Sequence, residues 1–461
     1  MKQSKILTLF SSIVLVSSIL SACSNTANNA TNAKATDKAT DKATDAKATD
    51  AKATDKAADG NASNKEGKVT ITYWNLFGGG DGEIMNQMVK KFNDEFKDKI
   101  EVKALTQDWG QYYTKLQTAV AGGVAPDVGI SHTSKLSEMV KLGIIEPLDE
   151  YAQAGGVSWS GYNQNILNAT IFDSKHYALP LDAHPFILYY NKKILKDMSL
   201  LSDDGKPKIE PGPDGFVSFL TKIKQNAPQG IYPMLLSSTG EDPYRLWWAF
   251  YNQMNGPGLL DQSGTKATFN NDQGKKAAEY VFNLFNKGLI PKNFQKIGET
   301  FQAGKAALLP SGVWFTGTLE ATKGLEFGAI PFPQIYDKPA TWIDSHTLVI
   351  PIQKKNKDPK KVQAAITFAK WITEQGAMWA KAGHIPASTT AVESQDFKSL
   401  PLRSDYLKAA NDGVYLPQSP KLWPAKDQLV QSLDAIWAGK EPVDKGLEKA
   451  VQNVEKVVSQ Q

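Results

Sequence analysis

The chain has 461 residues, of which 41% are hydrophobic and 10% aromatic, and its formal net charge is +4. A chain of this length and apolar content can bury a large core and is long enough for two or three domains. The small net charge argues against a nucleic-acid-binding protein, and the single cysteine, Cys23, excludes a disulfide within the chain.

The first 23 residues have the pattern of an export signal. Lys2 and Lys5 precede an apolar run that is interrupted by serines and is too short for a stable membrane span. The run ends in Leu-Ser-Ala-Cys at residues 20–23, which resembles the lipobox of a bacterial lipoprotein signal. The resemblance implies that Cys23 carries a lipid and becomes the N-terminus after cleavage. No second apolar segment of about 18 residues follows, so we expect no membrane-spanning helix.

Residues 24–66 are polar and repetitive, and they contain the run KATDKATDKATDAKATDAKATDKAADG. They show no apolar face at the period of a helix or of a strand, so they cannot form a core. Lysine and aspartate alternate evenly, and we interpret the segment as a disordered tether with an r.m.s. span of roughly 35–40 Å. Such a tether would hold a folded body away from the membrane without fixing its orientation.

From residue 68 onward, the hydrophobic periodicity predicts alternating strands and helices. The first predicted strands are 68–77, 100–105 and 126–130, and the helices beside them are 82–96, 112–123 and 135–141. Strands and helices in this order and at this spacing predict an α/β fold with a parallel sheet. Further strands are predicted at 175–181, 186–191, 306–310, 327–332 and 346–351, and amphipathic helices at 270–288, 358–375, 426–439 and 443–458.

Six stretches of the chain follow one another in an order typical of a known family. They are KLQTAVAGGVAPDV (115–128), GIIEPLDEY (143–151), YALPLDAHPFILYYNKKIL (177–195), FQAGKAALLPSGVW (301–314), FGAIPFP (327–333) and GHIPAS (383–388). Together they resemble the extracellular carbohydrate-binding lipoproteins of ABC importers, bacterial solute-binding proteins of the maltose/oligosaccharide-binding type. The resemblance covers about residues 68–450, and the order of the motifs is more specific than any one of them.

The resemblance implies a two-lobe periplasmic-binding-protein fold, in which each lobe is a mainly parallel sheet flanked by helices and the ligand lies between the lobes. It implies a monomer anchored to the outside of the cell membrane of a Gram-positive bacterium, without a cofactor, that delivers a sugar to an ABC permease. The implied division of the chain is a signal peptide at 1–23, a tether at 24–66, an N-terminal lobe at 67–181 and 345–386, and a C-terminal lobe at 182–344 and 387–461.

Candidate ligand contacts stand directly after the first predicted strands, because ligands of open α/β sheets bind at the carboxyl ends of strands. Phe77 could stack on a sugar ring, and Asp81 could either accept a hydrogen bond from a sugar hydroxyl or cap the next helix. Trp109 either fixes its helix to the sheet or faces the ligand. The third strand is followed by His132 and Thr133, where relatives of the maltose-binding type place polar contacts.

The remaining candidates lie in the second half of the resemblance. Asp182 and His184 occupy the crossover between the lobes, near the place of an acidic contact in those relatives. The other candidate contacts are Tyr244, Arg245, Trp247, Gly312, Trp314, Trp342, Asp344, His346 and Trp423. Aromatic rings suit the flat C–H faces of sugars, although ordinary core filling is the alternative for each. Of the adjacent Trp247 and Trp248, we expect at most one to reach the ligand. Three other tryptophans are expected in the core: Trp74, Trp371 and Trp379.

Other functions stay open. The chain has no motif of a serine hydrolase, a zinc protease or a phosphate-binding loop, but a glycoside hydrolase would need only two of its 48 acidic residues. A charged ligand of the glycerol-phosphate type is disfavoured because Arg245 and Arg403 are the only arginines, although Arg245 could serve it. The five histidines do not have the spacing of a metal site, so none is predicted, although four of them fall on landmark loops: His132, His184, His346 and His384.

Overall fold

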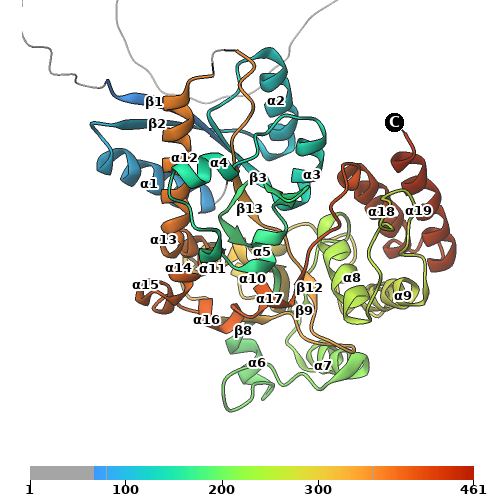
Figure 1. Ribbon diagram of the computed structural model, residues 1–461. Helices are drawn as coiled ribbons and strands as arrows, with labels where there is room; N and C mark the ends of the chain where they lie inside the picture. The colour runs from blue at the N-terminus through green and yellow to red at the C-terminus, as the bar shows by residue number, and fades with distance from the viewer. Residues whose placement is uncertain (1–66, 79, 356, 461) are drawn as a thin grey trace, which may run out of the picture. The chain divides into compact units, whose positions relative to one another are not determined.

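The computed structural model describes residues 67–460, with the exception of Gly79 and Asn356 (Figure 1). The predicted signal peptide, Cys23 and the predicted tether at 24–66 lie outside the described residues. Within the described part of the chain, no helix is long and apolar enough to cross a membrane.

The first sheet has five strands in the order β2-β1-β3-β13-β6. β1 (Val69–Asn75) runs parallel to β2 (Ile100–Thr106) and to β3 (Val128–His132), as the alternation of strands and helices predicts. β13 (His346–Val349) pairs antiparallel with β3 and with β6 (Leu179–Pro180). A strand from far along the chain therefore lies directly beside the end of β3.

Four long helices accompany this sheet: α1 (Gly80–Glu95), α2 (Trp109–Gly122), α3 (Thr133–Lys141) and α12 (Pro359–Glu374). α2 ends at Gly123, whose left-handed backbone (φ 73°) lets its N–H reach the carbonyl oxygens of the last helical turn, so the predicted glycine stop is confirmed. The core of this part includes Ile71, Tyr73, Met88, Phe92, Leu116, Ile130, Leu348 and Phe368.

The second sheet has four strands in the order β11-β8-β10-β9. β8 (Phe186–Asn191) pairs antiparallel with β10 (Ala306–Gly312) and with β11 (Phe327–Pro331), and only β9 (Tyr232–Met234) and β10 are parallel. The expected mainly parallel arrangement therefore holds for β1 to β3 but not in this sheet. The direction of β8 is set by the chain segment that brings it from the first sheet, and not by a β-α-β unit.

Five helices pack around the second sheet, and Figure 1 shows four of them grouped together. α8 (Glu241–Gln253) packs on α9 (Asp272–Asn286), and α18 (Leu422–Trp437) packs on α19 (Val443–Val458); α7 (Gly212–Asn226) lies against β9. Their core includes Trp247, Trp248, Phe250, Phe269, Leu433, Trp437 and Leu447.

Short strands mark the places where the chain passes between the sheets. β7 (Asp182–Ala183) pairs with β14 (Ile385–Pro386), and β12 (Thr341–Trp342) pairs with β15 (Gly413–Val414). The division into lobes at fixed residue boundaries stays a prediction. The shorter elements are α4 (Asp149–Ala154), α5 (Gln164–Asn168), β4 (Ile171–Phe172), β5 (Lys175–His176), α6 (Lys192–Asp197), α10 (Ile297–Gln302), α11 (Thr316–Glu320), α13 (Gly376–Trp379), α14 (Thr389–Glu393), α15 (Gln395–Lys398), α16 (Arg403–Tyr406) and α17 (Ala409–Asp412).

Candidate ligand-binding site

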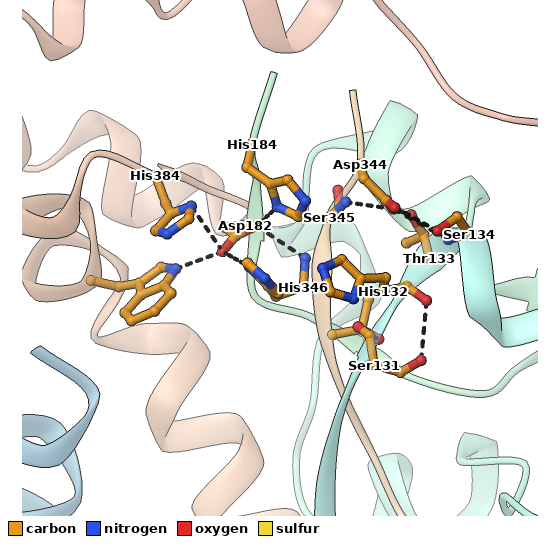
Figure 2. Close-up of polar contacts among 12 residues, drawn as sticks. Ser131, His132, Thr133, Ser134, Asp182, His184, Asp344, Ser345, His346 and His384 are labelled. Atoms are coloured by element: carbon orange, nitrogen blue, oxygen red, sulfur yellow. Dashed lines mark hydrogen bonds and ion pairs between the residues drawn. The ribbon is translucent and has the colours of Figure 1, made fainter. Parts of the chain in front are cut away.

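Asp182 is the centre of a buried polar cluster where β7, β13 and β14 come together (Figure 2). Its carboxylate accepts hydrogen bonds from Trp379 Nε1 at 2.6 Å and from the backbone N–H of His346 at 3.0 Å. It also shares hydrogen bonds with Nδ1 of His346 at 2.8 Å and Nδ1 of His184 at 3.0 Å. Nδ1 of His384 lies 3.5 Å from Oδ2. The Asp182 carboxylate thus joins β7, the start of β13 and the residue before β14.

The charges in this cluster follow from burial and pairing. Burial alone would raise the pKa of Asp182, but the charge of His346 and hydrogen bonds from His184 and His346 hold this pKa well below its usual value. Burial acts to lower the pKa of His346, but the charge of Asp182 and its hydrogen bond outweigh burial and raise it. Burial lowers the pKa of His184, and it lowers the pKa of His384 to about 3. Asp182 and His346 therefore form an ion pair beside two neutral imidazoles.

Asp344 is a second buried carboxylate, and it follows β12. Its Oδ1 accepts a hydrogen bond from Thr133 Oγ1 at 2.5 Å, and its Oδ2 accepts one from Ser134 Oγ at 2.5 Å (Figure 2). Burial would raise the pKa of Asp344, but the neighbouring histidines and the hydroxyl donors keep it below its usual value. Asp344 therefore joins the segment after β12 to the first turn of α3.

A pocket lies beside Asp344, and its walls come from elements of both sheets. It is lined by Trp109, His132, Ser134, Glu241, Arg245, Trp342, Asp344, Leu416, Trp423 and Lys426. His132 ends β3, so the pocket lies at the carboxyl end of a strand of the first sheet, where α/β proteins commonly bind ligands. Tyr113 fixes the His132 ring, because its hydroxyl lies 2.7 Å from Nδ1 of His132.

Trp423, on α18, contacts pocket residues of α2 and α3, which belong to the first sheet's part of the chain. Its ring stacks on Trp109 with centroids 6.0 Å apart, and its Nε1 donates a hydrogen bond to Ser134 Oγ at 3.1 Å. The ammonium group of Lys135 lies 4.7 Å from the Trp423 ring centroid. Trp423 packs against the hydrophobic cores of both sheets, whereas Trp109 is 51% exposed. An open aromatic face is therefore available at the edge of the pocket.

Arg245, on α8, forms the opposite wall. Its guanidinium group lies 4.5 Å from the Trp342 ring centroid and 5.2 Å from that of Trp314. It also pairs with Asp242 at 2.9 Å, and Glu241 pairs with Lys426. Two cations and two anions thus neutralise one another on this wall. The second arginine, Arg403, is buried and paired with Glu320, away from the pocket.

The pocket is small in this conformation. It encloses about 40 Å³, whereas pockets that hold small molecules commonly have roughly 300–1,000 Å³. A sugar ring can enter only if the walls separate. A roomier cavity of about 690 Å³ is lined by Thr72, Trp74 and the loop that precedes β3. That cavity lies toward the amino end of β3, so it does not have the position expected for a ligand of this fold.

The pocket brings together six of the predicted contacts: Trp109, His132, Arg245, Trp342, Asp344 and Trp423. Thr133 and Trp314 do not line the pocket but contact two residues that do, Asp344 and Arg245. Asp182, His184 and His346 belong to the buried cluster beside it. The ring of Trp314 occupies the space that a side chain at Gly312 would need, so this glycine makes room for the tryptophan.

Two candidates near the start of α1 lie away from the pocket lining. Phe77 is buried, and its ring centroid lies 4.9 Å from those of both His346 and Trp379, so it packs against the polar cluster. Asp81 stands in the first turn of α1, where its carboxylate accepts a hydrogen bond from the N–H of Gly82 at 2.8 Å. This contact supports the alternative of a helix-end role for Asp81.

Tyr244 and Trp247, which the sequence suggests as contacts, do not line this pocket. Both are fully buried in the core of the second sheet, and Trp247 Nε1 donates a hydrogen bond to the carbonyl of Gly274 at 3.0 Å. They lie on one apolar face of α8 together with Trp248 and Tyr251, because residues three and four apart share a helix face. Of the three contacts predicted on α8, only Arg245 lines the pocket.

Sequence reasoning missed four wall residues and one supporting residue. The pocket is also lined by Ser134, Glu241, Leu416 and Lys426, and Trp379, taken as a core residue, donates a hydrogen bond to Asp182. A signal existed for two of them. Glu241 precedes Arg245 by one helical turn, and Lys426 follows Trp423 by three residues, so each shares a helix face with a predicted contact.

Comparison with known proteins identifies the protein family of this chain. The family model for bacterial extracellular solute-binding proteins matches residues 78–379, and the chain belongs to this family. The maltotriose-binding protein of Pyrococcus abyssi is 22% identical over 336 residues, which are 70% of this chain and 66% of the relative. The maltodextrin-binding protein MdxE of Bacillus subtilis is 20% identical over 409 residues, which are 80% of this chain and 86% of that one.

Solved structures show the fold more closely. An ABC substrate-binding protein of Listeria monocytogenes, Lmo0181, in complex with cycloalternan, has a TM-score of 0.73 at 20% identity and covers 86% of this chain and 100% of its own. The maltotriose-binding protein of Thermus thermophilus, bound with maltotriose, has a TM-score of 0.69 at 22% identity and covers 84% and 100%. The chain therefore has the two-lobe α/β fold of periplasmic binding proteins, and the expected fold class is confirmed.

Proposed function

We propose that this protein captures a neutral sugar or oligosaccharide in the pocket beside Asp344 and delivers it to the permease of an ABC transporter. The observation that carries the proposal is the pocket itself. Trp109, Trp342 and Trp423 surround a buried carboxylate and an imidazole at the carboxyl end of β3. The names of relatives and structural neighbours, which bind maltotriose, maltodextrin or cycloalternan, support the same ligand class.

The chemistry of the pocket suits a sugar. The flat C–H faces of a sugar ring lie against aromatic rings, and the half-exposed Trp109 offers such a face. Sugar hydroxyls both donate and accept hydrogen bonds, and Asp344, Glu241 and His132 supply groups for them at the pocket wall. Arg245 and Lys426 are already paired with acidic residues, and the Asp344 carboxylate adds a negative charge, so the pocket favours a neutral ligand over an anion.

Binding in this pocket requires movement of its two walls. Trp109, His132 and Ser134 belong to elements of the first sheet, whereas Arg245 and Trp423 stand on helices of the second. Since the pocket encloses about 40 Å³, the walls separate to admit the sugar and close on it. A permease can respond to the sugar only if the loaded form differs in shape from the empty form. We assign residues 67–181 and 345–386 to one moving lobe and the other folded residues to the second.

The lipid anchor belongs to the same proposal. Cys23 would hold the protein at the outer face of the cell membrane, and residues 24–66 would let the folded body reach the permease. The protein would act as a monomer that binds and releases sugar without changing it.

A melting-temperature screen tests the ligand class, because a ligand that binds only the folded state raises its stability by mass action. The panel contains glucose, maltose, maltotriose, a cyclic tetrasaccharide and glycerol 3-phosphate. We expect stabilisation by at least one neutral sugar and none by glycerol 3-phosphate. A response to the phosphate alone would contradict the neutral-sugar proposal. An unchanged sugar after long incubation, checked by chromatography, would exclude hydrolysis.

A further inference from the structure

We propose that Asp182, His184, His346 and His384 form a binding site for one zinc ion, separate from the sugar pocket. One ligand atom from each of these four residues lies within 4.8 Å of all the others. The proposal goes beyond sugar binding and does not depend on it. Figure 2 shows the side chains of the three histidines turned toward the carboxylate of Asp182.

The donor set fits zinc better than other common ions. Zinc binds histidine nitrogen and carboxylate oxygen at about 2.0–2.2 Å in a tetrahedral arrangement, which places ligand atoms about 3.4 Å apart. The present ligand atoms lie within 4.8 Å of one another, at most about 1.4 Å wider than this separation, so the imidazole rings must turn inward to close the gap. Calcium and magnesium prefer sets of oxygen ligands, which this cluster lacks within the described residues. Four protein ligands would leave no open position, as in a structural zinc site.

His384 is the observation that points to a missing partner. The residue is fully buried, and neither ring nitrogen makes a hydrogen bond to any other described residue, although Nδ1 lies 3.5 Å from Oδ2 of Asp182. A buried polar group without a partner costs free energy, so native proteins rarely leave one. The ring of Trp379 stacks on His384, with centroids 4.7 Å apart and planes 2° from parallel, and holds the imidazole beside Asp182. A metal ion at the centre of the cluster would give His384 its partner.

Asp182 has the support that a metal-binding carboxylate needs. Trp379 Nε1 and the backbone N–H of His346 donate hydrogen bonds to it, and neither donor is a metal ligand. These two bonds keep the carboxylate oriented when zinc replaces the protons that His184 and His346 now share with it. His132 lies outside the group of four residues whose ligand atoms come within 4.8 Å of one another, and its Nδ1 is bonded to the Tyr113 hydroxyl at 2.7 Å.

The position of the site gives the ion a structural consequence. Its ligands come from β7 and the residue after it, from the start of β13, and from the residue before β14. These segments join the two sheets, so zinc would cross-link the connections between the sheets behind the pocket. The His184 ring centroid also lies 6.0 Å from that of Trp342, so the ion would stiffen one pocket wall.

The direct test is a zinc titration of the full chain after treatment with a chelator, read by competition with a chromophoric chelator. We expect one zinc ion per chain with sub-micromolar affinity, and a loss of at least about 100-fold in His384→Gln. The matched control is His176→Gln, because His176 pairs with Asp149 outside the cluster. This control should bind zinc like the wild type. Zinc binding that survives His384→Gln, or that disappears in His176→Gln, would overturn the proposal, and so would a wild type that binds no zinc.

A second measurement on the wild type does not depend on the folding of a variant. Cobalt(II) replaces zinc in such sites, and a four-coordinate ion gives intense visible absorption bands. We expect these bands at one equivalent and their loss on addition of zinc. A weak, six-coordinate spectrum would mean that the ion binds elsewhere and would overturn the site. Sugar binding is also measured on the chelator-treated protein. Because the proposed sugar binding requires no metal, this measurement tests the sugar pocket independently of the zinc site.

Discussion

Replacement of Trp423 by alanine is the variant that probes the pocket most selectively. The change removes the ring that stacks on Trp109 and the Nε1–H bond to Ser134. An aromatic pair contributes roughly 0.5–1.5 kcal/mol beyond its buried area, and a hydrogen bond roughly the same. The closed, loaded state therefore loses about 2 kcal/mol, which corresponds to roughly a thirtyfold weaker Kd. The assay is calorimetric titration with the sugar that gives the largest melting-temperature shift.

Trp437 on the same helix provides the control. It is 2% exposed and lies in the core of the second sheet, so Trp437→Leu should lower the free energy of unfolding by roughly 2–3 kcal/mol and leave the affinity unchanged. Trp423 is only half-buried, so its alanine variant should lose less stability and more affinity than the control. A Trp423→Ala protein that binds sugar within threefold of the wild type would refute the assignment of this ring to the ligand site.

Three further predictions concern closure, pH and anchoring. Small-angle scattering should show a smaller radius of gyration at saturating sugar than without it, and an identical radius would indicate a rigid pocket. Burial raises the pKa of Asp434 from its usual 3.8 to about 6, although hydrogen bonds from Gly240 oppose this. The folded chain thus holds a proton that the unfolded chain releases. The Asp434 carboxyl group therefore stabilises the folded state below about pH 4, and this stabilisation is lost as the pH rises through 6. Between pH 4 and pH 7, the free energy of unfolding should therefore fall by roughly 1–2 kcal/mol more in the wild type than in Asp434→Asn, as measured by chemical denaturation at the two pH values. An equal fall in both proteins would contradict the assignment. Cys23→Ala should abolish metabolic labelling with a palmitate analogue, and equal labelling would remove the anchor.

Local patterns predicted the three parallel strands of the first sheet, β1 to β3. The strands and helices from β1 to β3 were expected from hydrophobic periodicity, because each element buries one face against its sequence neighbours. The stop of α2 at Gly123 was also predictable from the chain alone. The pairing direction of β8 was not predictable, since it depends on where the chain segment from the first sheet enters the second sheet.

The site shows a similar limit. Tyr244, Trp247, Trp248 and Tyr251 recur at positions i, i+3, i+4 and i+7, a pattern that indicates a buried helix face, and this signal outweighs the preference of sugars for aromatic rings. The contacts of Asp182 with Trp379 join residues 197 positions apart. No local pattern specifies such a pair, so the polar cluster became visible only in the structure.

Calorimetric titration of the wild-type protein with neutral oligosaccharides at pH 7 tests the central proposal most directly. We expect one binding site per chain, with a negative heat-capacity change as apolar surface around the pocket becomes buried. The site should be lost or strongly weakened in Trp423→Ala and retained in Trp437→Leu. Absence of binding heat with every neutral sugar, together with saturable binding of an anionic solute, would contradict it.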